Sequence, residues 1–217
     1  MPKPHAARGI AAEGHVDRLL NGCVAIERGR FCWHQHHPPI RGGVRAKSGL
    51  PDREIVRNGR AYFLEVKEKT GESIEIGLLE GADTDCGGGI RPGQAATMDT
   101  LTAAGSPCYV VAILEVPAKA PRKRKDGTIS DPGRRAATIA RIVPWPTWRA
   151  LMAHAEEQRR EVERWQITAG SLMVAYGPDC ALPEKPTVNA SIPASALAAM
   201  GRPLASAADI LKALEQP

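Results

Sequence analysis

Residues 51–67 read Pro-Asp-Arg-Glu-Ile-Val-Arg-Asn-Gly-Arg-Ala-Tyr-Phe-Leu-Glu-Val-Lys and carry the strongest local structural signal in the chain. Two apolar runs, 51–57 and 60–67, flank Asn58-Gly59, the dipeptide that most strongly favours a tight turn between antiparallel strands. The sequence therefore predicts a β-hairpin. Both faces of its second strand carry apolar residues, so we expect that strand at the centre of a sheet covered on both sides.

The spacing of apolar and turn-forming residues predicts the remaining elements. Helices are expected at 9–22, 92–104, about 147–165 and 206–215. Strands are expected at 107–116, 137–143 and 171–176, with a hairpin turn at 28–30 inside 24–36 and an irregular acidic stretch at 70–91. This order predicts an α/β fold in which a mixed central sheet is flanked by helices. The helix after the hairpin should return a strand parallel to 60–67.

The chain is long enough for one packed domain and a smaller extension. We expect the domain at 1–168, with a basic hairpin loop at 117–136, and a partly flexible C-terminal appendage at 169–217. Residues 117–135 hold seven Lys and Arg side chains and two Asp, a net charge of +5 that equals the formal charge of the whole chain. A basic balance favours acidic partners such as nucleic acid.

Cysteine usage and hydropathy bear on the compartment. The five cysteines are widely spaced and form no Cys-x-x-Cys pair, which favours free thiols in a reducing environment. No apolar stretch follows the basic residues of the N-terminus, and no apolar run approaches the length that spans a membrane. These features predict a cytoplasmic protein with no membrane partner.

Two carboxylates and one amine are the strongest chemical candidates. Asp52 lies near the start of the first predicted strand, and Glu65 and Lys67 lie near the end of the second. Glu65 and Lys67 share one face because side chains alternate along a strand. Neighbouring strands would aim all three groups at one point, where carboxylate oxygens can bind Mg²⁺ or Mn²⁺ and the amine can orient or deprotonate water. The sequence therefore predicts a metal-dependent site that hydrolyses phosphodiesters.

Three further residues are candidates for the same site. Glu13, on the first predicted helix, could add an acid near the metal, and the main-chain carbonyl of Val66 could add another oxygen. Gln94 could position a phosphate or a water at the start of its helix. The predicted catalytic residues are Asp52, Glu65, Lys67, Glu13 and Gln94, and the predicted metal ligands are Asp52, Glu65, Val66 and Glu13.

Gly-Leu-Pro-Asp at 49–52, a strand ending Leu-Glu-Val-Lys, Pro-Gly-Gln opening a helix at 92–94 and a β-run after Gly105 resemble the PD-(D/E)xK nuclease superfamily. The VRR-NUC branch is the most similar, with Glu13 matching the acid of its N-terminal helix, and Holliday-junction resolvases are similar in layout. The resemblance covers roughly residues 9–116. It implies a restriction-endonuclease-like α-β-β-β-α-β core and a Mg²⁺-dependent DNA nuclease, endo- or exonucleolytic. Stand-alone family members are often phage-borne and can act on branched DNA, so a four-way-junction substrate and a homodimer are expected too.

Cationic residues in two segments are expected to contact DNA. The basic stretch has no interleaved aromatic residue, so contact with phosphates is expected rather than stacking on bases. The candidates are Arg41, Arg45, Lys47, Lys119, Arg122, Lys123, Arg124 and Lys125.

Two other classes of function are compatible with the same sequence. A catalytically silent DNA-binding protein would keep the fold, and its salt-dependent DNA binding would survive Lys67→Ala. A phage or plasmid accessory protein would act through protein partners and show no affinity for DNA. The spacing of the acidic residues alone is also compatible with a plain hairpin that carries a surface Asp and a Glu–Lys pair.

A second cluster of metal-binding residue types precedes the hairpin. Cys32, His34 and His36 would share one face of a strand, and His37 follows them. This spacing matches no standard structural zinc site and lacks an evident fourth ligand. We interpret the cluster as a strand leading into solvated or DNA-facing histidines, with metal binding left open.

Overall fold

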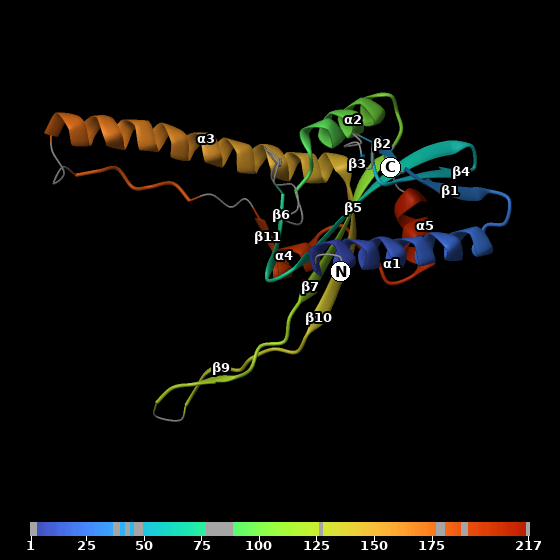
Figure 1. Cartoon of the computed structure of the whole chain (residues 1–217), viewed down its shortest axis with the longest axis horizontal. Helices are drawn as coiled ribbons and strands as arrows, with labels where there is room; N and C mark the ends of the chain where they lie inside the picture. Colours follow the sequence, from blue (N-terminus) through green and yellow to red (C-terminus); the bar gives the residue numbers. More distant parts are fainter. Residues whose placement is uncertain are drawn as a thin grey trace.

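The computed structural model describes residues 4–36, 40–41, 44–45, 50–76, 89–125, 128–176, 181–187 and 191–215. It is an α/β fold around a mixed six-stranded sheet with the strand order β1-β4-β5-β7-β10-β12 (Figure 1). These strands are β1 (Phe31–Gln35), β4 (Arg53–Arg57), β5 (Arg60–Thr70), β7 (Cys108–Val116), β10 (Ala137–Pro144) and β12 (Arg202–Pro203). The fold class expected from the sequence is confirmed.

The predicted hairpin supplies the second and third strands of this sheet. β4 and β5 pair antiparallel, and the turn residues Asn58 and Gly59 have φ angles of 51° and 77°. Positive φ at both positions matches the twist of a right-handed strand pair, which is why Asn-Gly is suited to the turn. Helix α2 (Pro92–Ala103) then returns the chain to β7, which pairs with β5 in parallel, as expected.

Helices cover both faces of the sheet. On one face Phe63 and Val110 pack with residues of α2 and α3 (Trp145–Tyr176), including Trp148. On the other face, Leu64 and Val111 pack with residues of α1 (Pro4–Ile26) and α5 (Ala207–Glu215). Because side chains alternate along β5, its odd-numbered residues face α2 and α3, and its even-numbered residues face α1 and α5.

The first helix is longer than the sequence predicts. α1 continues through Asn21-Gly22 to Ile26, so the expected hairpin within 24–36 is wrong and β1 follows a turn directly after the helix. A Cβ built on Gly22 would lie 2.9 Å from Cβ of Ala207. Gly22 therefore allows α5 to pack closely against α1, and it does not end the helix.

The C-terminal third also departs from prediction. Residues 171–176, expected as a strand, belong to α3, because a short apolar run has no period that separates strand from helix. The boundary expected between 168 and 169 falls inside this helix. Within the expected appendage, β12 pairs with β10, and β11 (Ser191–Pro193) pairs with β6 (Ser73–Glu75) before the short helix α4 (Ala194–Ala199). Residues 191–215 therefore contribute to the same core as the sheet.

A narrow two-stranded ribbon projects from the sheet between β7 and β10 (Figure 1). We call residues 117–135 the arm. It contains β8 (Arg122–Lys123) and β9 (Ile129–Asp131), and its base is closed by a bridge between Lys119 and Arg134. A second small pair, β2 (Ile40–Arg41) and β3 (Val44–Arg45), lies between β1 and β4 in the sequence.

In the part of the chain that the structure describes, no helix combines the length and apolar character needed to cross a bilayer.

Candidate functional site

Glu65 lies at the centre of the candidate site. It projects from β5 toward α2, and its side chain is only 1% exposed. Its Oε1 atom lies 2.6 Å from Nζ of Lys67 and accepts a hydrogen bond of 2.7 Å from Nε2 of Gln94. The strand places Lys67 on the same face as Glu65, and the first turn of α2 places Gln94 above them. One carboxylate oxygen is thus held from two directions.

The second oxygen of this carboxylate has no such support. Oε2 of Glu65 is buried and has no hydrogen-bond partner among the described residues. A buried carboxylate oxygen normally accepts hydrogen bonds or binds a cation, because leaving it without either costs about 1–3 kcal/mol or more. The fold therefore holds this oxygen in a position where, among the described residues, it lacks both a hydrogen-bond donor and a cation, which is unfavourable.

A second carboxylate lies next to Glu65. Asp52, at the start of β4, accepts a hydrogen bond of 2.8 Å at Oδ2 from the amide N–H of Val66. Burial and, second to it, repulsion from the Glu65 carboxylate raise the pKa of Asp52 to about 7. Attraction to Lys67 and the Val66 hydrogen bond act in the opposite direction, and Glu13 adds the smallest upward effect. Asp52 and Glu65 are therefore electrostatically coupled across the two strands.

Backbone contacts fix the position of Asp52. The carbonyl of Asp52 accepts a hydrogen bond of 2.9 Å from Nη1 of Arg53 and one of 3.0 Å from the amide of His36. The His36 ring contacts the carbonyl of Pro51 through Nδ1 at 2.8 Å and Oε2 of Glu54 through Nε2 at 3.2 Å. These contacts tie the start of β4 to the end of β1.

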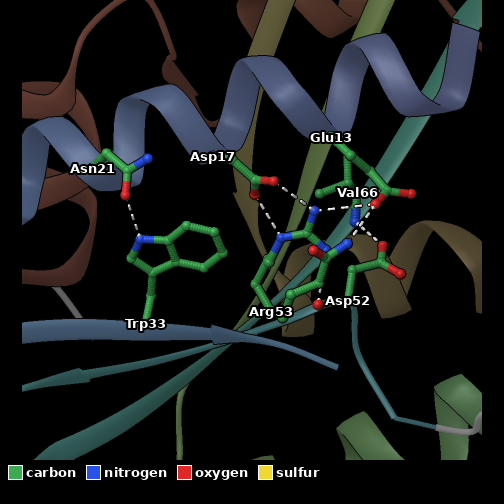
Figure 2. Close-up of polar contacts among 8 residues, drawn as sticks. Glu13, Asp17, Asn21, Trp33, Asp52, Arg53 and Val66 are labelled. Atoms are coloured by element: carbon green, nitrogen blue, oxygen red, sulfur yellow. Dashed lines mark hydrogen bonds and ion pairs between the residues drawn. The ribbon is translucent and has the colours of Figure 1, made fainter. Parts of the chain in front are cut away.

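Arg53 connects this region to α1. Figure 2 shows its guanidinium between Asp17 and Glu13, beside Asp52. Nε of Arg53 lies 2.7 Å from Oδ1 of Asp17, and Nη2 lies 3.1 Å from Oε2 of Glu13. The Arg53 side chain is 1% exposed, and its Cζ atom lies 5.9 Å from the centroid of the Trp33 ring. A buried guanidinium paired with two carboxylates holds helix and strand in one register.

The structure brings four of the five predicted catalytic residues into one group. Glu65 contacts Lys67 and Gln94 directly, and Asp52 lies close enough to Glu65 and Lys67 to interact with both electrostatically. Glu13 lies close enough to affect Asp52, but its Oε2 atom pairs with Arg53 and accepts a hydrogen bond of 3.1 Å from Nε2 of Gln35. Its role as a metal ligand stays a prediction.

Among the described residues, the three acids predicted to bind the metal, Asp52, Glu65 and Glu13, do not gather into a three-carboxylate metal site. Val66 contacts Asp52 through its amide, and the role of its carbonyl stays a prediction. Over the described residues, no three His, Cys, Asp or Glu side chains gather in a way that would hold a metal ion. This finding covers the described part of the Cys32/His34/His36 cluster, where Cys32 and His34 are exposed and His36 binds Pro51 and Glu54. His37 lies outside the described residues.

The predicted DNA-binding residues fall into two groups. In the arm, Lys119 forms an ion pair of 2.7 Å with Asp131, and Arg122, Arg124 and Lys125 are exposed. The side chain of Lys123 is not described. Arg41 and Arg45 lie in β2 and β3, whose side chains are not described either, and Lys47 lies outside the described residues.

Sequence reasoning missed the residues that position Asp52. Arg53 and Asp17 were not candidates, and His36 was a candidate only as part of the Cys32/His34/His36 cluster. The alternation along β4 offered a signal, because Arg53 and Arg57 share a face with the apolar Ile55. A charged residue on a buried face requires an ionic partner, which Glu13 and Asp17 of α1 supply for Arg53, and Glu27 and Glu215 supply for Arg57.

No protein-family model matches this chain, and a search of curated proteins finds no significant match.

Proposed function

We propose that this protein is a Mg²⁺-dependent nuclease that hydrolyses phosphodiester bonds in DNA, with Asp52, Glu65, Lys67 and Gln94 at its active site. Branched DNA, including four-way junctions, is the preferred substrate class in this proposal.

The observation that carries the proposal is the state of the Glu65 carboxylate. One oxygen is held by Lys67 and Gln94, while the other is buried without a partner beside Asp52, whose pKa is raised to about 7. Two neighbouring carboxylates, one buried and one half-buried, destabilise a fold unless a cation or a proton offsets their repulsion. Clusters of this kind occur where a site is selected for chemistry.

The residues present fit a hard divalent cation. Mg²⁺ is commonly held by only one or two carboxylates, with water and substrate phosphate oxygens as its other ligands. Asp52 and Glu65 fit this requirement, with the Val66 carbonyl as a further candidate. When bound, Mg²⁺ would lower the pKa of a water molecule and offset negative charge on the phosphate.

The protein's own groups prepare the site in three ways. Lys67 and Gln94 both hold Oε1 of Glu65, so Oε2 is the oxygen that remains for a cation. Asp52 must lose its proton to bind a cation, and a pKa of about 7 places that loss in the neutral range. The ammonium group of Lys67 and the N-terminus of α2 offer positive charge and N–H donors to a phosphate.

A cleavage panel tests this function. Linear duplex, single-stranded, flap and four-way-junction DNA are each incubated with Mg²⁺, Mn²⁺ or EDTA. We expect cleavage of at least one substrate, with branched DNA preferred, only when the divalent metal is present. Glu65→Gln keeps the size of the side chain but removes its charge, so its cleavage rate should fall at least about 100-fold.

Glu75→Gln is the matched control, because Glu75 also pairs with a β5 lysine, Lys69, but lies on a more exposed surface. It should cleave at the wild-type rate. Cleavage that persists in EDTA or in Glu65→Gln would contradict the proposed chemistry. DNA binding without cleavage under every condition would identify a silent DNA-binding protein instead.

A further inference from the structure

The cations of the arm fall into two sets. At its base, Nζ of Lys119 lies 2.7 Å from Oδ2 of Asp131, and Nη2 of Arg134 lies 2.7 Å from Oε1 of Glu72. Arg134 also donates a hydrogen bond of 3.1 Å from Nε to the carbonyl of Pro117. These contacts neutralise Lys119 and Arg134 and anchor the arm to the body of the protein.

The outer cations have no such neutralisation. Arg122, Arg124 and Lys125 are exposed, and over the described residues none of them forms an ion pair with an acidic side chain. Neighbouring positive charges repel one another, so a cluster of this kind costs stability unless a polyanion binds it. Lys119 and Arg134, near the sheet-proximal end of the arm, are thus paired with acidic residues of the protein, whereas the described cations of its outer part are not.

The shape of the arm limits which kind of polyanion it can bind. Backbone hydrogen bonds join its two strands from Lys119 and Arg134 out to Arg124 and Thr128. A two-stranded ribbon of this kind fits the major groove of B-DNA, which is about 12 Å wide, whereas the major groove of duplex RNA is too narrow and deep. No aromatic residue occurs in 117–135, so the arm lacks the stacking surfaces that hold single strands.

The position of the arm restricts where it would bind. Lys67 of the candidate site is paired with Ala112 of β7, and β7 continues into the arm. Arg124 follows Ala112 by twelve residues, a path of at most about 40 Å at roughly 3.3 Å per residue. Figure 1 shows that the arm bends away from the sheet, which shortens this reach. One turn of B-DNA measures about 34–36 Å.

We infer that the arm is a ribbon for duplex DNA, which lies in the major groove about one helical turn from the bond to be cleaved, with Arg122 and Arg124 on backbone phosphates. The inference rests on the proposed function for the position of the bond. The binding event itself does not depend on cleavage. The arm would then select duplex DNA and hold it while the site acts.

Binding in EDTA tests the arm separately from catalysis. Fluorescence anisotropy would measure the affinity of the full chain for a DNA duplex of about three helical turns, the matching RNA duplex and the matching single strand, over a range of salt concentrations. The test variant is Arg122→Gln/Arg124→Gln. The matched control is Arg28→Gln/Arg30→Gln, which removes the same charge from exposed residues of the turn before β1.

We expect the wild type to prefer the DNA duplex over both other ligands. In the arm variant, the slope of log affinity against log salt should fall by about 2, and affinity near 0.1 M salt should fall about 10- to 100-fold. The control should show less than half of that change, so its slope should fall by less than about 1 unit. Equal thermal melting of both variants would show that each is folded.

A second binding experiment identifies the groove that the arm occupies. A duplex whose cytosines carry glucosylated hydroxymethyl groups has a filled major groove, and the wild type should bind it as weakly as the arm variant binds plain DNA. A minor-groove ligand should leave binding unchanged. The inference is overturned if the arm variant binds like the control, if RNA duplex or single strands bind equally well, if glucosylation has no effect, or if wild type shows no DNA affinity at low salt. Failed cleavage with these binding results intact would reject only the proposed function.

Discussion

The amide N–H of Val66 donates a hydrogen bond of 2.8 Å to Oδ2 of Asp52, and so joins the two strands of the central hairpin through a side chain. Val66 lies between Glu65 and Lys67 on β5, so this contact brings Asp52 to the level of both. The Asp52 carboxylate is then close enough to Glu65 for the two negative charges to repel each other. The arrangement should reduce stability and favour cation binding.

Replacing Asp52 by Asn should stabilise the fold. The pKa of Asp52 is raised from 3.8 to about 7, so between these values the folded state keeps a proton that the unfolded state releases. The free energy of unfolding of the wild type should therefore fall as pH rises from about 4 to about 7, and stay low above it. At pH 8, Asp52→Asn should raise it by about 1–3 kcal/mol while abolishing cleavage. Urea unfolding across this pH range measures the effect.

Asp209 provides a control of opposite sign. Its burial raises the pKa, but hydrogen bonds from Ala205 and Ser206 outweigh that effect and hold the pKa below its ordinary value. Its ionised form therefore stabilises the fold above the ordinary pKa of an Asp, and Asp209→Asn should lower the free energy of unfolding by about 1 kcal/mol at pH 8. Equal effects of the two substitutions would contradict the account of Asp52.

Removing the amine of Lys67 should leave a buried charge unpaired. Lys67→Met removes the partner of a carboxylate that is 1% exposed, and should lower the free energy of unfolding by about 3–5 kcal/mol. The double variant Glu65→Gln/Lys67→Met removes both charges and should recover most of this loss, without restoring cleavage. Chemical unfolding and the cleavage assay provide the two readouts.

Lys69 is the matched control for Lys67. It lies two residues further along β5 and pairs with Glu75, but both side chains are more exposed, at 28% and 40%. Lys69→Met should therefore cost less than about 1 kcal/mol. A similar loss for Lys67→Met and Lys69→Met would show that Glu65 is not effectively buried.

Arg53 should be essential for the position of Asp52. Arg53→Met removes a buried guanidinium from Asp17 and Glu13, which are 26% and 38% exposed, and should cost about 1–3 kcal/mol of unfolding free energy. Arg53→Lys keeps the charge but cannot make the forked contacts to both carboxylates and the Asp52 carbonyl, so an intermediate loss is expected. Exposed Arg60 is the control, and Arg60→Met should change stability by less than about 0.5 kcal/mol. If Arg53→Lys left the free energy of unfolding unchanged, a positioning role for Arg53 would be contradicted.

Two glycines of α1 should respond in opposite ways to alanine. Gly14 has no atom within 4 Å of a built Cβ, so Gly14→Ala should stabilise the helix by about 0.5–1 kcal/mol. A Cβ on Gly22 would meet Cβ of Ala207 at 2.9 Å, so Gly22→Ala should lose this gain and cost about 1–3 kcal/mol. Thermal melting distinguishes the two, and stabilisation by both would contradict the close packing of α5 on α1.

The parts of the fold that were predicted from the sequence are those set by local chemistry. Asn58-Gly59 specified the hairpin turn, and the apolar runs at 107–116 and 137–143 closely match β7 and β10. The errors have two causes: a distant contact that overrides the local signal, and an apolar run too short to show a period. Gly22 has the sequence character of a helix stop, but it lies inside α1 because the absence of a Cβ lets Ala207 pack beside it. Residues 171–176 form an apolar run, but they continue α3.

The candidate site also contains residues that the sequence could predict and contacts that it could not. Asp52, Glu65, Lys67 and Gln94 could be named because each contributes a reactive group at a position that neighbouring strands and a helix start would bring together. The contacts of Glu13 could not be read from the sequence, since they depend on the buried Arg53 of another element. Partners between distant segments are set by tertiary packing and leave no local pattern.

Mg²⁺ binding to the purified chain tests most directly whether Asp52 and Glu65 share one cation. Titration calorimetry at pH 8 should give one Mg²⁺ per chain, with affinity that falls as pH drops below about 7 because a proton then competes at Asp52. Asp52→Asn and Glu65→Gln should each abolish binding, and saturating Mg²⁺ should raise the melting temperature of the wild type alone. Binding that survives both substitutions unchanged would contradict the shared site.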